Sequence, residues 1–162
     1  MIFLEPIILS AEFAGNMLLI IIVGLVFAEY FSCIRKHFRQ DGDFAQKRHE
    51  IRILLGIAVV AAIWLIAEFF IDAHMVWYHL AVHLPIVIVL IFLLIHLARK
   101  NPTHVSRMLL VFLILLLLLH PVLDIIMLFA DFQLIMLLRA IAKFLETLML
   151  FFFILKYLIN AG

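Results

Sequence analysis

Five long apolar stretches run through almost the whole sequence, and they decide which solvent the chain can fold in. They lie near residues 7–31, 51–72, 75–97, 105–129 and 132–158. A helix needs roughly 20 mostly apolar residues to cross the hydrocarbon core of a bilayer, and each stretch has that length. Apolar side chains make up 69% of the chain, whereas a soluble globular domain has roughly 45–50%. The sequence therefore predicts an all-α integral membrane protein, a bundle of five transmembrane helices that forms one domain over residues 1–162.

The charged residues between the stretches predict how the helices are oriented. Two of the connections are very short, so we expect helices adjacent in sequence to pack antiparallel. Lys and Arg gather on one side of the predicted membrane, at Arg35, Lys36, Arg39, Lys47, Arg48, Arg52, Arg99, Lys100, Arg107 and Lys156. The opposite side carries Glu5, Asp72 and Asp131, without Lys or Arg. Because basic loops stay in the cytoplasm, we expect the N-terminus outside and the C-terminus inside, in a prokaryotic cytoplasmic membrane.

The sequence also narrows the range of partners. It contains no basic patch interleaved with aromatic residues, so we expect no nucleic acid partner. Cys33 is the only cysteine, which excludes an intrachain disulfide and a site built from several thiolates. A bundle of 162 residues is small for an independent transporter. We therefore expect a chain surrounded by membrane lipids that forms a homo-oligomer or serves as a subunit of a larger membrane complex.

Polar side chains recur inside four of the predicted spans at matching depths. At about 1.5 Å per residue from the outer end, Glu12, Glu68, His79 and Asp124 lie roughly 6–8 Å deep, and Asn16, His83 and His120 roughly 12–14 Å deep. Within a span these residues are spaced i, i+4, as in His79/His83 and His120/Asp124, so they share one helix face. Because polar groups facing lipid are costly, we expect these faces to meet in the centre of the bundle.

Two prolines fall in the middle of predicted spans, close to these histidines. Pro85 and Pro121 each remove one helical hydrogen bond and free the carbonyl four residues earlier, at Ala81 and Leu117. Non-helical or broken backbone within a membrane protein commonly lines a site or a cavity. The prolines therefore support a site at the depth of His83 and His120.

The residue types in this layer favour a metal site. Imidazole and carboxylate together suit Zn, Fe, Mn or Cu, and bundle cores hold metals with such side chains from facing helices. The candidate ligands, in descending order of expectation, are His83, His79, His120, Asp124, Glu68 and Glu12. No named metal-binding motif is present, so the prediction rests on depth and helix face. Such a metal would be transported, or would serve redox or hydrolytic chemistry with a metal-activated water.

The last stretch adds charges that could balance the carboxylates. Arg139, Lys143 and Glu146 fall on one face of the helix expected over residues 132–158. They are predicted to form ion pairs with the polar layer, as is Asp72 at the outer edge.

Three other functions fit the same residues. His83 and His120 could be the two axial ligands of a b-type haem in an electron-transfer subunit, although no glycine nearby makes room for a porphyrin. A chain of Asp, Glu and His could relay protons, although the layer stops about halfway across the predicted membrane. Finally, the polar residues could form a structural network in an accessory subunit without a cofactor.

Overall fold

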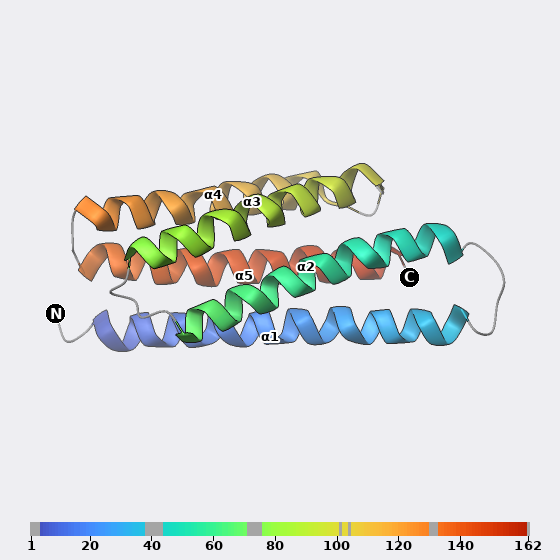
Figure 1. The fold of residues 1–162 in the computed structure, drawn as a ribbon, viewed down its shortest axis with the longest axis horizontal. Coiled ribbons are helices and arrows are strands. Elements are labelled where there is room, and N and C mark those ends of the chain that lie inside the picture. Colours follow the sequence, from blue (N-terminus) through green and yellow to red (C-terminus); the bar gives the residue numbers. More distant parts are fainter. Residues whose placement is uncertain are drawn as a thin grey trace.

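Five α-helices make up the described part of the chain. The structure is a computed structural model, and it describes residues 4–37, 44–70, 76–100, 102–103, 105–129 and 133–161. The helices are α1 (Leu4–His37), α2 (Phe44–Phe70), α3 (Val76–Lys100), α4 (Arg107–Phe129) and α5 (Gln133–Ala161). They extend broadly along the long axis of the molecule (Figure 1). The prediction of an all-helical chain with five helices is confirmed.

The helices are longer at several ends than hydropathy predicts. α1 extends from Leu4 to His37 rather than over residues 7–31, and α2 begins at Phe44 rather than near residue 51. α3 and α5 likewise continue to Lys100 and Ala161. Hydropathy finds the part of a helix that suits hydrocarbon, whereas backbone hydrogen bonding continues through the polar residues that flank it.

α5 differs from the other four helices in the side chains that it buries. α1 to α4 are each long and apolar enough to cross a membrane. α5 carries Arg139, Lys143, Glu146 and Lys156. It buries Lys143, Glu146 and Thr147, whereas Leu138, Ile141 and Leu145 are exposed. Its polar face is therefore turned into the bundle and an apolar face outward, the reverse of a surface helix of a soluble protein.

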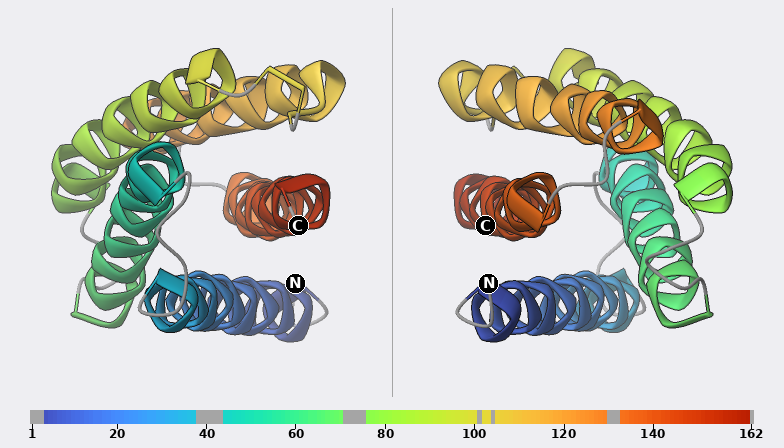
Figure 2. Two further views of the ribbon diagram at one scale, coloured as in Figure 1. Left: turned by 90° about the vertical axis from the view of Figure 1, so that its right-hand side faces the viewer. Right: turned by 90° about the vertical axis from the view of Figure 1, so that its left-hand side faces the viewer.

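The five helices form a closed ring around a shared interior. Close backbone contacts join α1 to α2, α2 to α3, α3 to α4, α4 to α5 and α5 to α1. In the end-on views, α5 lies between α1 and α4 and faces α2 and α3 across the interior (Figure 2). Among the described residues, α2 and α3 make no close backbone contact with α5. Side chains must therefore fill the space between them.

One part of this interior is apolar and the other is polar. The apolar part is built from residues such as Leu90, Leu94, Leu113, Ile57 and Phe153, all 2% exposed or less. The buried polar residues belong to the first half of α3 and α5 and the second half of α4. These parts of the helices lie toward the end of the bundle where α1 begins (Figure 1). Pro85 and Pro121 lie inside α3 and α4 without ending either helix.

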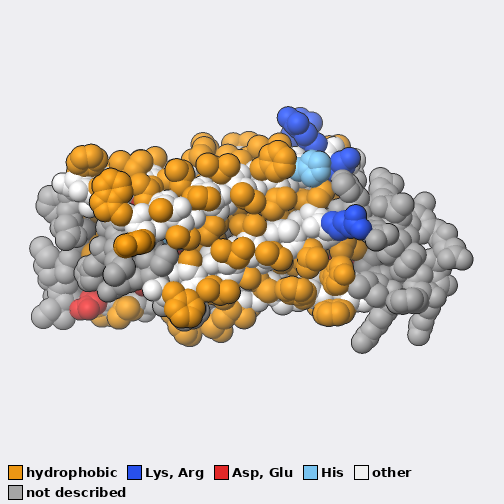
Figure 3. Space-filling view, viewed as in Figure 1, with side chains coloured by type: hydrophobic (Ala, Val, Ile, Leu, Met, Phe, Trp, Pro, Cys, Tyr) orange, Lys and Arg blue, Asp and Glu red, His pale blue; other side chains and the backbone are white. Residues whose placement is uncertain are grey.

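The outer surface is mainly apolar. Large side chains such as Phe92 and Leu115 are 68% and 58% exposed, and hydrophobic side chains cover most of the face in Figure 3. The Lys and Arg side chains visible on this face gather toward the end where α3 finishes. Exposed basic residues on the described helices include Arg52, Arg99, Lys100 and Arg107, whereas Glu5 is exposed at the start of α1.

Candidate metal site

Two histidines and one carboxylate converge between α3 and α4. His83 comes from α3, and His120 and Asp124 lie one turn apart on α4. All three are 1% exposed or less. One possible ligand atom of each lies within 4.8 Å of the others, and among the described residues no other group of three His, Cys, Asp or Glu side chains meets this condition. The group could hold a metal ion.

The two imidazoles are in direct contact. Their ring centroids lie 4.8 Å apart, at an interplanar angle of 80°. Trp64 of α2 packs edge to face against both rings, with centroids 6.1 Å from His83 and 6.1 Å from His120. Its indole thus covers the histidines from the α2 side and joins the site to the apolar core.

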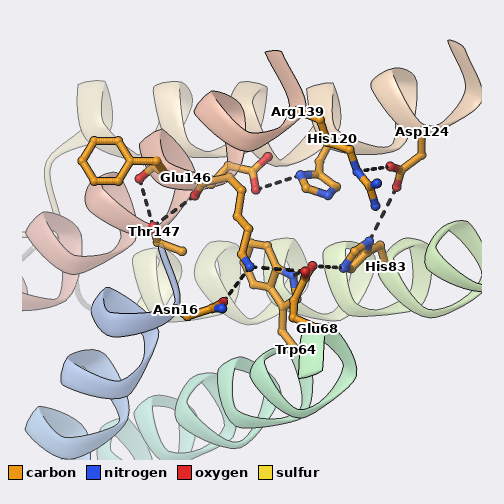
Figure 4. Close-up of polar contacts among 11 residues, drawn as sticks. Asn16, Trp64, Glu68, His83, His120, Asp124, Arg139, Glu146 and Thr147 are labelled. Atoms are coloured by element: carbon orange, nitrogen blue, oxygen red, sulfur yellow. Dashed lines mark hydrogen bonds and ion pairs between the residues drawn. The ribbon is translucent and has the colours of Figure 1, made fainter. Parts of the chain in front are cut away.

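Ion pairs connect these ligands to the neighbouring helices (Figure 4). Asp124 Oδ1 lies 2.7 Å from Arg139 Nε of α5. His83 Nε2 lies 2.8 Å from Glu68 Oε1 of α2. His83 Nδ1 lies 3.6 Å from Asp124 Oδ2, which is longer than a hydrogen bond. Asp124 Oδ2 is therefore turned toward His83 without a strong bond to it.

Glu68 connects the site to α1 and α5. Lys143 Nζ lies 3.3 Å from Glu68 Oε2 and donates a 2.6 Å hydrogen bond to Asn16 Oδ1. Trp64 Nε1 donates a 3.3 Å hydrogen bond to Glu68 Oε1. The buried lysine thus bridges α1, α2 and α5 through two acceptors. We use the name polar cluster for Asn16, Trp64, Glu68, His83, His120, Asp124, Arg139, Lys143 and Glu146.

Glu146 is the one carboxylate of the polar cluster without a Lys or Arg partner among the described residues. Its side chain is fully buried, and Oε2 lies 3.3 Å from His120 Nδ1. Both imidazole nitrogens of His120 and both carboxylate oxygens of Glu146 are buried and form no hydrogen bond in the described chain. Asp124 and Glu68 have their cations in Arg139 and Lys143. The carboxyl group of Glu146 thus has only an imidazole as its described polar partner.

The structure brings some of the sequence-predicted residues together in this site but not all of them. Glu68, His83, His120 and Asp124 lie together, and Arg139, Lys143 and Glu146 each contact a member of that group. Glu12 lies one turn before Asn16 and is only partly buried, and in the described chain its side chain forms no ion pair. The side chain of His79 and the whole of Asp72 lie outside the described residues.

Sequence reasoning missed two features of the site. Trp64 is absent from the sequence-predicted residues, although its spacing of four residues from Glu68 places the two on one helix face. The two depth layers also gave no indication of a contact between them, yet Glu68 of the shallower layer pairs with His83 of the deeper one. A glutamate side chain is long enough to reach across the roughly 5.4 Å of one helical turn.

The fold and the site together define a class of protein, namely a helical bundle with possible membrane spans and a buried group of potential metal ligands. The chain is all-helical, four of its helices could cross a membrane, and a buried His/His/Asp group could hold a metal ion. Comparison with models of known protein families, with curated proteins and with solved structures found no match. Function can therefore be inferred only from the residues of this chain.

Proposed function

We propose that this chain is an integral membrane protein that binds a transition metal ion between α3 and α4. His83, His120 and Asp124 are the proposed ligands. The observation that carries the proposal is their convergence within 4.8 Å at a fully buried position. Polar groups inside a membrane are costly and mark functional sites by default.

The proposed orientation follows from the distribution of exposed charge. Arg52, Arg99, Lys100 and Arg107 are exposed, and those on α3 and α4 flank the connection between these helices. Glu5 is exposed at the start of α1. We assign the basic end to the cytoplasm and the end with Glu5 to the outside, with successive helices antiparallel. The metal site then lies in the outer half of the membrane.

The charge balance of the polar cluster supports a bound cation. Its carboxylates are Glu68, Asp124 and Glu146, and its fixed cations are Arg139 and Lys143. A buried charge without a partner is strongly unfavourable. A metal ion on His120 would supply the missing positive charge next to Glu146. Imidazole and carboxylate ligands suit Zn, Fe, Mn or Cu.

The apolar half of the interior favours a metal that stays in place over one that crosses the bundle. Beyond Trp64 the described interior is filled by side chains such as Leu90, Leu94 and Phe153. These side chains offer no ligands for an ion passing toward the cytoplasmic end. We therefore favour a resident metal with a redox or hydrolytic role, and the geometry supports transport less well.

The first test is the metal content of gently purified protein, measured by elemental mass spectrometry without chelators. Wild-type protein should contain a stoichiometric transition metal, and the His83→Ala/His120→Ala double variant should lose it. His96→Ala is the matched control, because His96 lies at the other end of α3, stacked on Phe92. This control should keep its metal. Wild-type protein without metal would contradict the proposal.

The haem alternative fits the geometry poorly. A porphyrin has to lie between its two axial imidazoles. The rings of His83 and His120 are in contact, with centroids 4.8 Å apart, and Trp64 packs against both. A reduced-minus-oxidised visible spectrum of the same preparation would reveal a haem.

A cofactor-free structural network remains the second candidate, and the ion pairs favour it. Arg139 with Asp124 and Lys143 with Glu68 already join α5 to α4 and α2. In that case both His83→Ala and His120→Ala would lower stability and leave the metal content unchanged. The same elemental analysis therefore separates the two functions.

A further inference from the structure

Each side chain of the buried His/His/Asp group is backed by a charged side chain from a different helix. Asp124 of α4 is paired with Arg139 of α5, and His83 of α3 with Glu68 of α2. His120 of α4 faces Glu146 of α5. The His/His/Asp group thus comes from α3 and α4, and its acidic and basic partners come from α2 and α5. Figure 4 shows Glu146 and Arg139 reaching from α5 toward His120 and Asp124.

We propose that Glu146 is the positioning residue for His120 and that it makes Nε2 the metal-binding atom of this imidazole. The inference rests on the proposed metal site and adds the role of a residue outside the ligand set. Histidines that bind metals generally donate their second N–H to a carboxylate or a carbonyl, which fixes the tautomer and the ring orientation.

The contacts of the two imidazole nitrogens support this assignment. A neutral imidazole has one N–H donor and one acceptor nitrogen. His120 Nδ1 lies 3.3 Å from Glu146 Oε2, and the two atoms form no hydrogen bond in this structure. Nδ1 is nevertheless the nitrogen that faces the carboxylate, so a proton on Nδ1 would be placed for donation to Glu146. The lone pair then lies on Nε2, which is buried without a hydrogen-bond partner in the described chain. A metal bound there would make Nδ1–H more acidic and shorten its contact with Glu146.

The polar side chains nearest to Glu146 on α5 have other partners. The Glu146 side chain is fully buried, and Lys143, one turn earlier on α5, is engaged with Glu68 and Asn16. Thr147 donates its hydroxyl hydrogen bonds to the carbonyls of Lys143 and Phe144 on its own helix. Glu146 is therefore the α5 side chain aimed at His120, and the bound cation would balance its charge.

The test compares Glu146→Leu and Glu146→Gln with Thr147→Val. Thr147→Val is the matched control, because it removes a buried polar group from the next position of α5 without touching either histidine. Zn²⁺ affinity is measured by competition with a chelator of known affinity. The Cu²⁺-loaded proteins are examined by pulsed EPR, which detects the remote nitrogen of a coordinated imidazole and its hydrogen bonding. Circular dichroism verifies that each variant is folded.

We expect Glu146→Leu to weaken Zn²⁺ binding by about 10- to 100-fold, the usual cost of losing such a partner. The remote-nitrogen signal of one imidazole should change in the same variant. Glu146→Gln should lie between Glu146→Leu and wild type, since the amide oxygen still accepts a hydrogen bond. Thr147→Val should bind like wild type.

Three outcomes would overturn the inference. Unchanged affinity and EPR signal in Glu146→Leu would leave the metal site standing without a positioning role for Glu146. Loss of binding in both Glu146 variants as complete as in His120→Ala would make Glu146 a ligand. Wild-type protein that binds neither ion would overturn the proposed function and this inference together.

Discussion

Asp124 illustrates how a single buried charge is accommodated in this chain. Its side chain is fully buried, with Oδ1 2.7 Å from Arg139 Nε and Oδ2 turned toward His83. One oxygen thus meets a permanent cation while the other faces an imidazole. A carboxylate held in this way can bind a metal through one oxygen and keep its orientation through the other.

The pair of Asp124 and Arg139 gives a prediction about stability. With a chelator present, Asp124→Asn should lower the free energy of unfolding by about 3–5 kcal/mol, because it leaves the mostly buried guanidinium uncompensated. Adding Arg139→Met should restore most of this loss, since the unpaired charge is then removed as well. Unfolding in detergent micelles, followed by circular dichroism, measures both variants. A double variant no more stable than Asp124→Asn would contradict this account.

At the scale of elements, α5 depends on close packing against α1. A Cβ added at Gly15 would meet the Lys143 side chain and Thr147 Oγ1, each at 3.6 Å, which is ordinary van der Waals contact. A single methyl group therefore fits between the helices, and a larger side chain does not. Asn16, the next residue of α1, accepts the hydrogen bond of Lys143, so this packing also holds the lysine in the polar cluster.

Substitutions at two glycines of α1 test this packing. Gly15→Ala should be neutral or stabilising by up to about 1 kcal/mol, because alanine favours a helix. Gly15→Leu should destabilise by about 1–3 kcal/mol, because the α1–α5 contact is overpacked. Gly24→Leu is the control, since a Cβ at Gly24 meets nothing within 4 Å. Thermal unfolding measures all three variants, and equal effects of leucine at Gly15 and Gly24 would refute the prediction.

The sequence predicts which segments form helices much better than it predicts which helices pack together. Length and hydropathy suffice to predict five helices, of which α1 to α4 are long and apolar enough to cross a membrane. The spacing of His120 and Asp124 likewise predicts one shared helix face. The short connections predict that α4 and α5 lie side by side, whereas no sequence signal indicates that α5 also packs against α1.

The sequence likewise does not predict which polar residues contact one another in the site. The polar residues were predicted to meet because few alternatives exist inside a membrane. Which ones meet depends on side-chain reach: Glu68 contacts His83 one turn deeper, whereas Glu12 stays at the partly exposed edge. Glu146 was expected to form an ion pair, and its described partner is His120. No sequence pattern indicates that this partner is a histidine and not Arg or Lys.

At the scale of the whole molecule, the proposed orientation can be tested with the single cysteine. A membrane-impermeant maleimide should label Cys33 in inverted membrane vesicles and leave it unlabelled in intact cells, since the basic end is assigned to the cytoplasm. In the Cys33→Ser background, Glu5→Cys should show the reverse pattern. Labelling of Cys33 from outside intact cells would refute the orientation.

The order of the helices around the interior has a consequence for biosynthesis. α5 closes the ring by packing against α1 and α4, and it carries Arg139 and Lys143. A ribosome makes the chain in sequence order, so Glu68 and Asp124 are synthesised before the two cations that they pair with. Until α5 is synthesised, neither acid has its Arg or Lys partner. A nascent chain that ends before α5 would thus leave Glu68 and Asp124 without their cations, and we expect it to be less stable than the chain with all five helices.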